Sequence, residues 1–288
     1  MHSPQQSDKN RTTGVVLVLV SALVFSTAGI FTNGVETDAW GVIFWRGLAA
    51  ASFTLAYLAV RGALFHEIRL FNRPALIATV LMAAGTAAFI PAFKLSSVAN
   101  VALIYASAPF VAAGMSWIFL KEAPSRIIVI ASSLAFVGVL AIVSGSVEQT
   151  SLLGDLLAFF MTLMMAGTMV VYRAHPETTA ALPAALSSIV LLPIAWFAGD
   201  PLAIPEGEFP ILVAFGLVFA IASVTLSEGA RRLPSPETAL LSSLEVPIAP
   251  VLAWLVLSEE PSIRVLIGGA VIFFAVLWSQ MRAQSYRQ

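Results

Sequence analysis

The chain consists of long apolar runs separated by short polar connections, and this pattern extends from one end to the other. A transmembrane helix needs about 17–25 mostly apolar residues, and ten runs meet that length. They span residues 13–33, 39–60, 74–93, 97–119, 126–145, 152–172, 179–198, 209–229, 236–257 and 263–281. The pattern therefore predicts an all-α, polytopic membrane protein of ten transmembrane helices.

Two other interpretations of these runs fail. A transmembrane β-barrel would need segments of about ten residues that alternate apolar and polar positions, whereas these runs are continuous and rich in Ala, Leu and Gly. The first run is too long for the central region of a signal peptide, so we expect a retained helix.

Composition agrees with a bilayer as the solvent. Hydrophobic residues make up 59% of the 288 residues and charged residues only 11%, whereas a soluble domain carries about 25% charged residues. Cysteine is absent, which excludes disulfides, thiolate metal sites and cysteine nucleophiles.

Lys and Arg predict the orientation, because they concentrate in short cytoplasmic loops. With the N-terminus inside, twelve of them lie on the cytoplasmic side and two, Lys94 and Arg264, lie outside. We therefore expect both termini in the cytoplasm. The same rule accounts for the basic residues without any binding of nucleic acid.

The second half of the chain repeats the first at an offset of 138 residues. KLSSVANVALIYASAP at 94–109 aligns without a gap with RLPSPETALLSSLEVP at 232–247. We expect one repeat at 14–147 and the other at 148–282. Each holds five helices, so the second crosses the membrane upside down relative to the first. Such inverted repeats are typical of secondary transporters, whose substrate site lies near the midplane and whose halves rock to give alternating access.

At these motifs the chain resembles the drug/metabolite transporter superfamily in its ten-helix EamA branch, over nearly its whole length. The resemblance rests on RGLAAA at 46–51, on LEVP at 244–247 followed by VLAWLVLSEEP, and on the weaker copy YASAPFVAAGMSWIFLKEAP at 105–124. It implies a transporter of the bacterial inner membrane that exports small organic metabolites. The chain is most similar to the bacterial exporters of aromatic and other amino acids.

Arg46 and Glu245 are the charges interpreted as internal, because they lie away from the ends of the predicted helices. Arg46 lies six residues after Trp40, or about 9 Å along a helix, from where a long side chain can reach the headgroups. Alternatively it faces the bundle interior and binds a substrate carboxylate or bridges backbone carbonyls, because a charge near the bilayer centre is costly.

Glu245 is expected to share one helix face with Thr238 and Ser242. It is a proton carrier or a counter-charge for an amine, or else a buried carboxylic acid that bonds a neighbouring helix. The equivalent first-half positions are Asn100, Ile104 and Ser107, so two polar faces would meet at a central cavity.

Prolines and deep apolar side chains complete the candidate cavity. Pro109, Pro247 and Pro250 fall inside predicted helices, where they are expected to bend the chain as hinges or as static kinks. Five apolar or aromatic side chains are either a pocket for a substrate or ordinary packing. They are Phe25, Tyr105, Phe160, Met161 and Met164.

Several function classes are disfavoured. No Gly-Lys-Ser/Thr motif supports pumping driven by ATP, so the substrate gradient or a coupled ion is expected to supply the energy. A membrane-embedded enzyme would need converging titratable groups or a metal cluster, and the three histidines fall in the tail or loops.

Drugs, nucleosides and sugar derivatives stay as alternative substrates. A channel is also disfavoured, because two inverted halves suit a rocking transporter better than a fixed pore. The expected partners are the substrate and the lipid bilayer, with no cofactor or metal, and a monomer would suffice.

Overall fold

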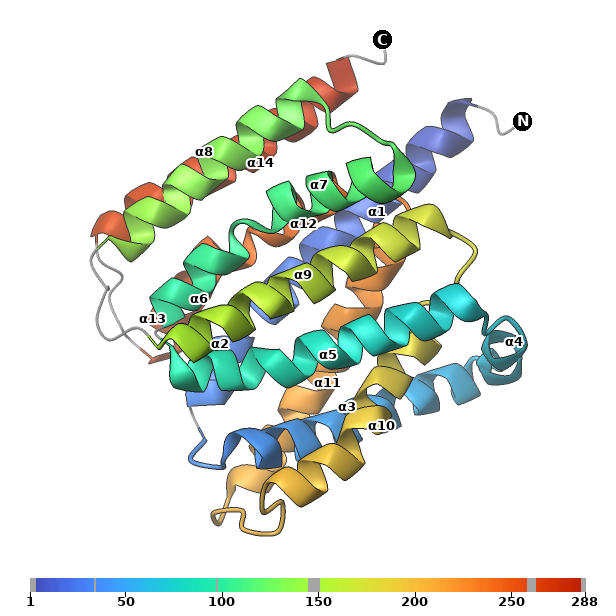
Figure 1. Cartoon of the computed structure of the whole chain (residues 1–288), viewed down its shortest axis with the longest axis vertical. Coiled ribbons are helices and arrows are strands. Elements are labelled where there is room, and N and C mark those ends of the chain that lie inside the picture. Colours follow the sequence, from blue (N-terminus) through green and yellow to red (C-terminus); the bar gives the residue numbers. More distant parts are fainter. Residues whose placement is uncertain (1–3, 34, 97, 145–150, 258–262, 286–288) are drawn as a thin grey trace.

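A computed structural model describes residues 4–33, 35–96, 98–144, 151–257 and 263–285, and within these residues all regular structure is helical (Figure 1). The helices are α1 (Pro4–Phe25), α2 (Ala28–Asn33), α3 (Ala39–Val60), α4 (Leu64–Arg69), α5 (Arg73–Leu95), α6 (Val98–Tyr105), α7 (Ala108–Leu120), α8 (Arg126–Val143), α9 (Leu152–Ala174), α10 (Ala181–Ala198), α11 (Glu208–Ala230), α12 (Ser235–Ser242), α13 (Glu245–Leu257) and α14 (Ile263–Ser285).

Each of the ten predicted segments is helical, and three of them consist of two consecutive helices: α1 and α2, α6 and α7, and α12 and α13. Among the described residues, seven helices are long and apolar enough to cross a membrane, and Arg126–Ile142 is a shorter apolar helix. The short helix α4 was not expected from the hydropathy pattern, and α1 begins at Pro4, ahead of the predicted segment.

Polar side chains immediately before the helices fix where several of them begin. The carboxylate of Asp38 accepts the N–H groups of Trp40 and Gly41 at 3.1 and 3.2 Å ahead of α3. Asn72 accepts the N–H of Ala75 at 3.0 Å at the start of α5. Such caps satisfy amide groups that have no partner within the helix.

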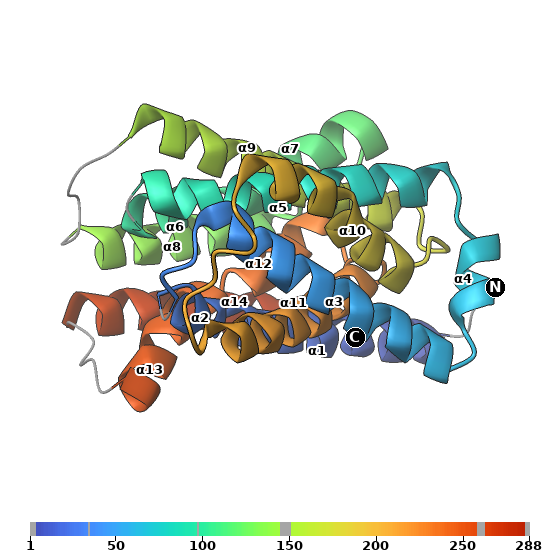
Figure 2. The ribbon, with the colours of Figure 1, turned by 90° about the horizontal axis from the view of Figure 1, so that it is seen from below.

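Helix contacts follow an approximate two-fold symmetry between the predicted halves. The first helix of each half packs on the third long helix of the other half: α9 lies beside α5, and α1 lies beside α11 (Figures 1 and 2). The equivalent helices α3 and α10 pack on each other, as do α8 and α14. This pairing is that of two inverted repeats packed face to face. The predicted boundary at 147 and 148 lies outside the described residues.

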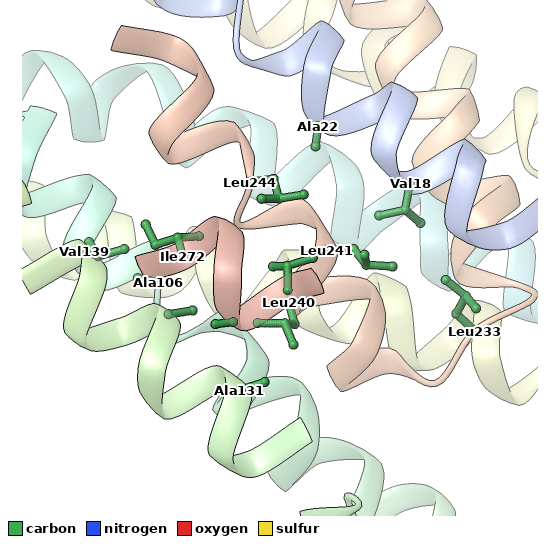
Figure 3. Close-up of a cluster of buried hydrophobic side chains, with 13 residues drawn as sticks. Val18, Ala22, Ala106, Ala131, Val139, Leu233, Leu240, Leu241, Leu244 and Ile272 are labelled. Atoms are coloured by element: carbon green, nitrogen blue, oxygen red, sulfur yellow. The ribbon is translucent and has the colours of Figure 1, made fainter. Parts of the chain in front are cut away.

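Buried apolar residues join the halves at several places, the largest cluster lying between α1, α8, α12 and α14. Figure 3 shows Val18 and Ala22 of α1 facing Leu240, Leu241 and Leu244, while Ala131, Val139 and Ile272 close the other side. The outward faces are also apolar. On α9, the exposed residues at helical spacing are Leu152, Leu153, Leu156, Phe159 and Phe160, as expected where lipid replaces water.

One end of the bundle carries the start of α1 and the end of α14 (Figure 1). The connections from α3 to α5, from α7 to α8, from α9 to α10 and from α11 to α12 lie at that same end. They contain most of the arginines used to predict the cytoplasmic side. We call this the basic end, and its assignment to the cytoplasm stays a prediction.

The contact between α8 and α14 generates a stability prediction. A Cβ at Gly268 would lie 2.3 Å from the carbonyl oxygen of Gly138, so Gly268→Ala forces these helices apart. We expect a loss of about 1–3 kcal/mol in the free energy of unfolding, measured by thermal denaturation in detergent. Gly114→Ala is the matched control, because nothing lies within 4 Å of its Cβ position. Equal melting temperatures for the two variants would contradict the close approach.

Candidate functional site

Three helices are interrupted near their middles. The interruptions fall at Ser26–Thr27 between α1 and α2, at Ala106–Ser107 between α6 and α7, and at Ser243–Leu244 between α12 and α13. The last two are 137 residues apart, one residue from the repeat offset of 138, so they lie in equivalent helices of the repeats. Interrupted helices near the midplane are where secondary transporters build their sites.

Serine and threonine hydroxyls stabilise each interruption. Ser26 and Thr27 donate to the carbonyl oxygens of Leu23 and Val24 at 2.6 and 2.7 Å. Ser107 donates in the same way to the oxygen of Ile104 at 2.6 Å, and Ser243 to that of Leu240 at 2.6 Å. Each hydroxyl satisfies a carbonyl three residues earlier, which matters because the bilayer core offers no water.

The prolines lie just after two of these interruptions instead of within continuous helices. Pro109 is the second residue of α7 and Pro247 the third of α13, whereas Pro250 is inside α13. A proline in the first turn of a helix costs no hydrogen bond, because its missing N–H would have had no helical partner. Pro109 and Pro247 therefore begin new helical segments, while Pro250 is the one of the three that stays within a helix.

Tyr105 and Glu245 meet across the two halves. Tyr105 ends α6 and Glu245 begins α13, and the tyrosine hydroxyl hydrogen-bonds the carboxylate. Both side chains are partly buried. Helix α13 also contacts α1 and α2, so this pair lies beside the interruption in the first helix. The hydroxyl of Tyr105 and the carboxylate of Glu245, which belong to opposite repeats, are thus joined at the helix interruptions.

The predicted polar stripe on the ninth segment is divided by the interruption. Thr238 and Ser242 lie on α12, before the interruption, and Glu245 lies after it, so a continuous helix face does not join them. The hydroxyl of Thr238 donates to the carbonyl oxygen of Pro234, directly before α12, at 3.2 Å, and that of Ser242 donates to the oxygen of Thr238 at 3.0 Å. Both residues are buried. The side chain of Asn100 lies outside the described residues.

Arg46 faces the protein interior and not the headgroups, with 2% of its surface exposed. Its guanidinium carbon lies 4.1 Å from the ring centroid of Phe219 and 5.3 Å from that of Phe215, both on α11. Among the described residues it forms no ion pair, and its Nε has no hydrogen-bond partner. Arg46 is therefore a buried cation held against aromatic faces, with no acidic partner in the described chain.

A glycine brings the aromatic rings to Arg46. A Cβ at Gly216 would lie 2.4 Å from the Cβ of Ala49 and 2.7 Å from the carbonyl oxygen of Arg46, so α3 and α11 are in backbone contact there. Phe25 packs edge-on against Phe219, with ring centroids 6.0 Å apart. Phe31 stacks on Phe215 at 5.4 Å. These four rings and the guanidinium form one group, which we call the aromatic cage.

Sequence reasoning missed most of the aromatic cage. Phe215 and Phe219 are four residues apart and therefore share a helix face, a spacing that could have identified them. Only the close approach at Gly216 shows that this face meets Arg46.

The remaining predicted pocket residues are not brought together. Phe160 is 42% exposed on the outward face of α9, so its assignment to a pocket was wrong. Its helical spacing with Leu152, Leu156 and Phe159 puts it on the lipid side. Met161 is buried in a small core between α5, α6 and α9, and Met164 packs 3.3 Å from the Cβ position of Gly85. These two side chains fill space between helices.

A third buried charge lies at the basic end. Glu237 is 5% exposed and pairs with Arg11, while Gln280 donates to the same carboxylate oxygen at 3.0 Å. This inner network links α1 to α12 and α14. Glu237 is the second residue of the predicted segment 236–257, and for this reason it was not counted as an internal charge.

The opposite end has its own network. The carboxylate of Glu208 on α11 accepts the N–H of Glu36 at 2.6 Å and both the N–H and the hydroxyl of Thr37. Lys94 at the end of α5 donates to the carbonyl oxygen of Thr37 at 3.1 Å. This outer network also joins the two halves. The described residues contain no group of three or more His, Asp or Glu that could hold a metal.

Interrupted helices, inverted halves and a buried cation define a class of protein, the multi-pass membrane transporters. The EamA-like transporter family model matches residues 12–144 and again 152–280. The chain belongs to this family, within the drug/metabolite transporter superfamily. It is therefore a membrane transporter of small molecules and not an enzyme.

The chain is also similar to one curated protein and to one solved structure. An uncharacterized transporter of Bacillus subtilis strain 168, YxxF, is 23% identical over 296 residues, which covers 98% of this chain and 94% of that protein. A solved crystal structure superimposes with a TM-score of 0.81 at 16% identity, covering 95% of this chain and 99% of that one. The second likeness concerns the fold alone.

The burial of Arg46 generates a prediction about stability. A buried cation without an acidic partner is costly, so Arg46→Met should raise the free energy of unfolding by about 1–4 kcal/mol. Thermal denaturation in detergent measures this change. The control variant Arg231→Met removes an arginine that forms a 2.7 Å ion pair with Glu228, so no increase in the free energy of unfolding is expected. A lower melting temperature for Arg46→Met would mean that the guanidinium holds helices together.

Proposed function

We propose that this transporter exports small organic metabolites, amino acids foremost, across a bacterial inner membrane by alternating access between its halves. The observation that carries the proposal is the buried guanidinium of Arg46 without an acidic partner in the described chain. Intramembrane ionisable residues mark substrate pathways, because an unused charge there costs energy without benefit.

Arg46 suits a carboxylate. A guanidinium binds a carboxylate through two parallel N–H···O bonds, and burial strengthens such bonds. The rings of Phe25, Phe215 and Phe219 line the same place and supply apolar surface for a substrate side chain. A ligand with a carboxylate next to an apolar group fits this combination, as amino acids do.

Glu245 and Tyr105 suit the other end of such a ligand. The carboxylate of Glu245 accepts from an ammonium group, and Tyr105 orients it from the opposite half. Ser107, Thr238 and Ser242 lie close by in sequence and keep free lone pairs for further hydrogen bonds. In this proposal Glu245 is also the place where a proton would couple to transport.

The two end networks support alternating access. The inner network joins α1 to α12 and α14, and the outer network joins α11 to the segment before α3. Each crosses between the halves, and each consists of a few polar contacts that can break and reform. Rocking of the halves would open one network while the other stays closed. The basic end is the cytoplasmic side in this scheme.

Counterflow tests the substrate and the site. Purified protein is reconstituted into liposomes preloaded with unlabelled amino acids, and uptake of labelled amino acids is measured with and without a pH gradient. Wild type should exchange, and Arg46→Met should lose roughly ten- to a hundredfold in apparent affinity, the value of a charged hydrogen bond. Glu245→Gln should exchange without responding to the gradient.

Phe197→Leu is the control, because this side chain is 87% exposed to the lipid side of α10 and should leave exchange unchanged. Exchange by Arg46→Met at wild-type affinity would remove Arg46 from the site. Wild-type protein that carries none of the amino acids, but exchanges nucleosides or sugar derivatives, would overturn the substrate class.

Cross-linking tests alternating access. The chain has no cysteine, so only introduced pairs react. Arg11→Cys with Glu237→Cys spans the inner network, and Thr37→Cys with Glu208→Cys spans the outer one. A short thiol cross-linker should abolish counterflow in either double variant, and each single variant should be insensitive to it. Full exchange by a cross-linked double variant would contradict the rocking of the halves.

A further inference from the structure

An open apolar hollow of about 490 Å³ lies at the basic end, between α3, α4 and α10. Its wall consists of Leu55, Leu64, Ile68, Phe71, Leu182, Leu186 and Ile189. The volume falls within the range of about 300–1,000 Å³ that small-molecule sites occupy. The wall offers almost no polar atoms, so the part of a ligand that fits here is a hydrocarbon.

Three arginines lie within three residues of wall residues of this hollow in the sequence. Arg61 directly follows α3, three residues before Leu64, Arg69 follows the wall residue Ile68, and Arg73 begins α5 two residues after Phe71. All three are exposed. Within the described chain none of them forms an ion pair, and the guanidinium of Arg61 donates to the neutral hydroxyl of Tyr57 at 3.3 Å. Their charge is therefore available to an anion at the mouth of the hollow.

The nearby acids do not cancel this charge. The Glu67 carboxylate turns inward and accepts the N–H of Leu182 at 2.7 Å, and partial burial raises the pKa of that carboxyl from its ordinary value. Glu228 on α11 is already paired with Arg231 and Arg232. The rim is consequently basic while the wall is apolar.

The surroundings place the hollow at the membrane surface. Helix α4 lies at the edge of the bundle, across the ends of the long helices (Figure 2). Phe65 is 76% exposed and Val60 89% exposed, as expected of side chains that dip into lipid. An apolar hollow that opens between lipid and a row of arginines lies where headgroups meet acyl chains.

We propose that this hollow binds one anionic phospholipid, with an acyl chain against Leu186 and Ile189 and the phosphate among Arg61, Arg69 and Arg73. The lipid would fill the space between α3 and α10 at the basic end. The proposal rests on this geometry and not on the transported substrate, so it stands or falls separately from the proposed function.

The repeat supplies an internal comparison. The equivalent connection between α10 and α11, residues 199–207, contains Asp200 and Glu206 and no lysine or arginine. A lipid phosphate would be repelled there. The proposed lipid site therefore lies at the basic end of the α3–α10 pair, and the equivalent connection at the opposite end lacks the arginines to form one.

Native mass spectrometry of the full chain, released from nanodiscs of equal phosphatidylglycerol and phosphatidylcholine, tests the proposal. Wild type should retain one phosphatidylglycerol in preference to phosphatidylcholine. The triple variant Arg61→Gln, Arg69→Gln and Arg73→Gln should weaken retention by roughly 100-fold, about fivefold for each charge near a membrane surface. The matched triple variant Lys121→Gln, Arg126→Gln and Arg282→Gln removes the same charge from the same end, and retention should be unchanged.

A second pair of variants tests the hollow without changing charge. Ile189→Trp fills the wall and should expel the lipid, whereas Ile194→Trp, on the outward face of the same helix, should not. Equal retention of both lipids by wild type would overturn the proposal, as would equal losses in the two triple variants. Unchanged retention in Ile189→Trp would overturn the assignment of the acyl chain to this hollow.

Discussion

The bilayer core offers no hydrogen-bonding partner to a peptide group, and the architecture of this protein depends on that constraint. Helices satisfy their own backbone, so an interruption near the midplane needs local donors. Ser107 and Ser243 supply them at the interruptions of equivalent helices in the two repeats. With those carbonyls satisfied, the chain can change course in the membrane and present Tyr105 and Glu245 at the ends of facing helical segments.

The burial of Arg46 depends on a second balance, between the cost of removing a guanidinium from water and its attraction to aromatic rings. A guanidinium in a low-dielectric interior is costly, and aromatic faces offset only part of that cost. The close approach at Gly216 brings Phe215 and Phe219 onto Arg46 without supplying an acid. The protein thus keeps a partly compensated charge in its interior, and this charge is the basis of the proposed anion site.

Departures from symmetry carry the specific chemistry. The helix pairs obey an approximate two-fold relation, yet α1 and α2 are interrupted where the equivalent α9 is continuous. Glu245 corresponds to Ser107, and the arginine-rich connection after α3 corresponds to an acidic one after α10. In the proposed mechanism, the symmetric frame allows rocking between two similar states, and the asymmetric residues supply the polar substrate site and the orientation in the membrane.

Length and hydropathy alone predicted the helical segments, because a bilayer imposes a fixed span on every apolar run. The repeat at an offset of 138 residues predicted the inverted halves, and the cost of a buried charge singled out Arg46 and Glu245. Tertiary packing alone decided that Arg46 meets Phe219, that Glu245 meets Tyr105 and that Phe160 faces lipid. The physical reason is that lipid and protein interior are equally apolar, so hydropathy cannot tell an outward face from an inward one, and only contacts between distant helices separate them.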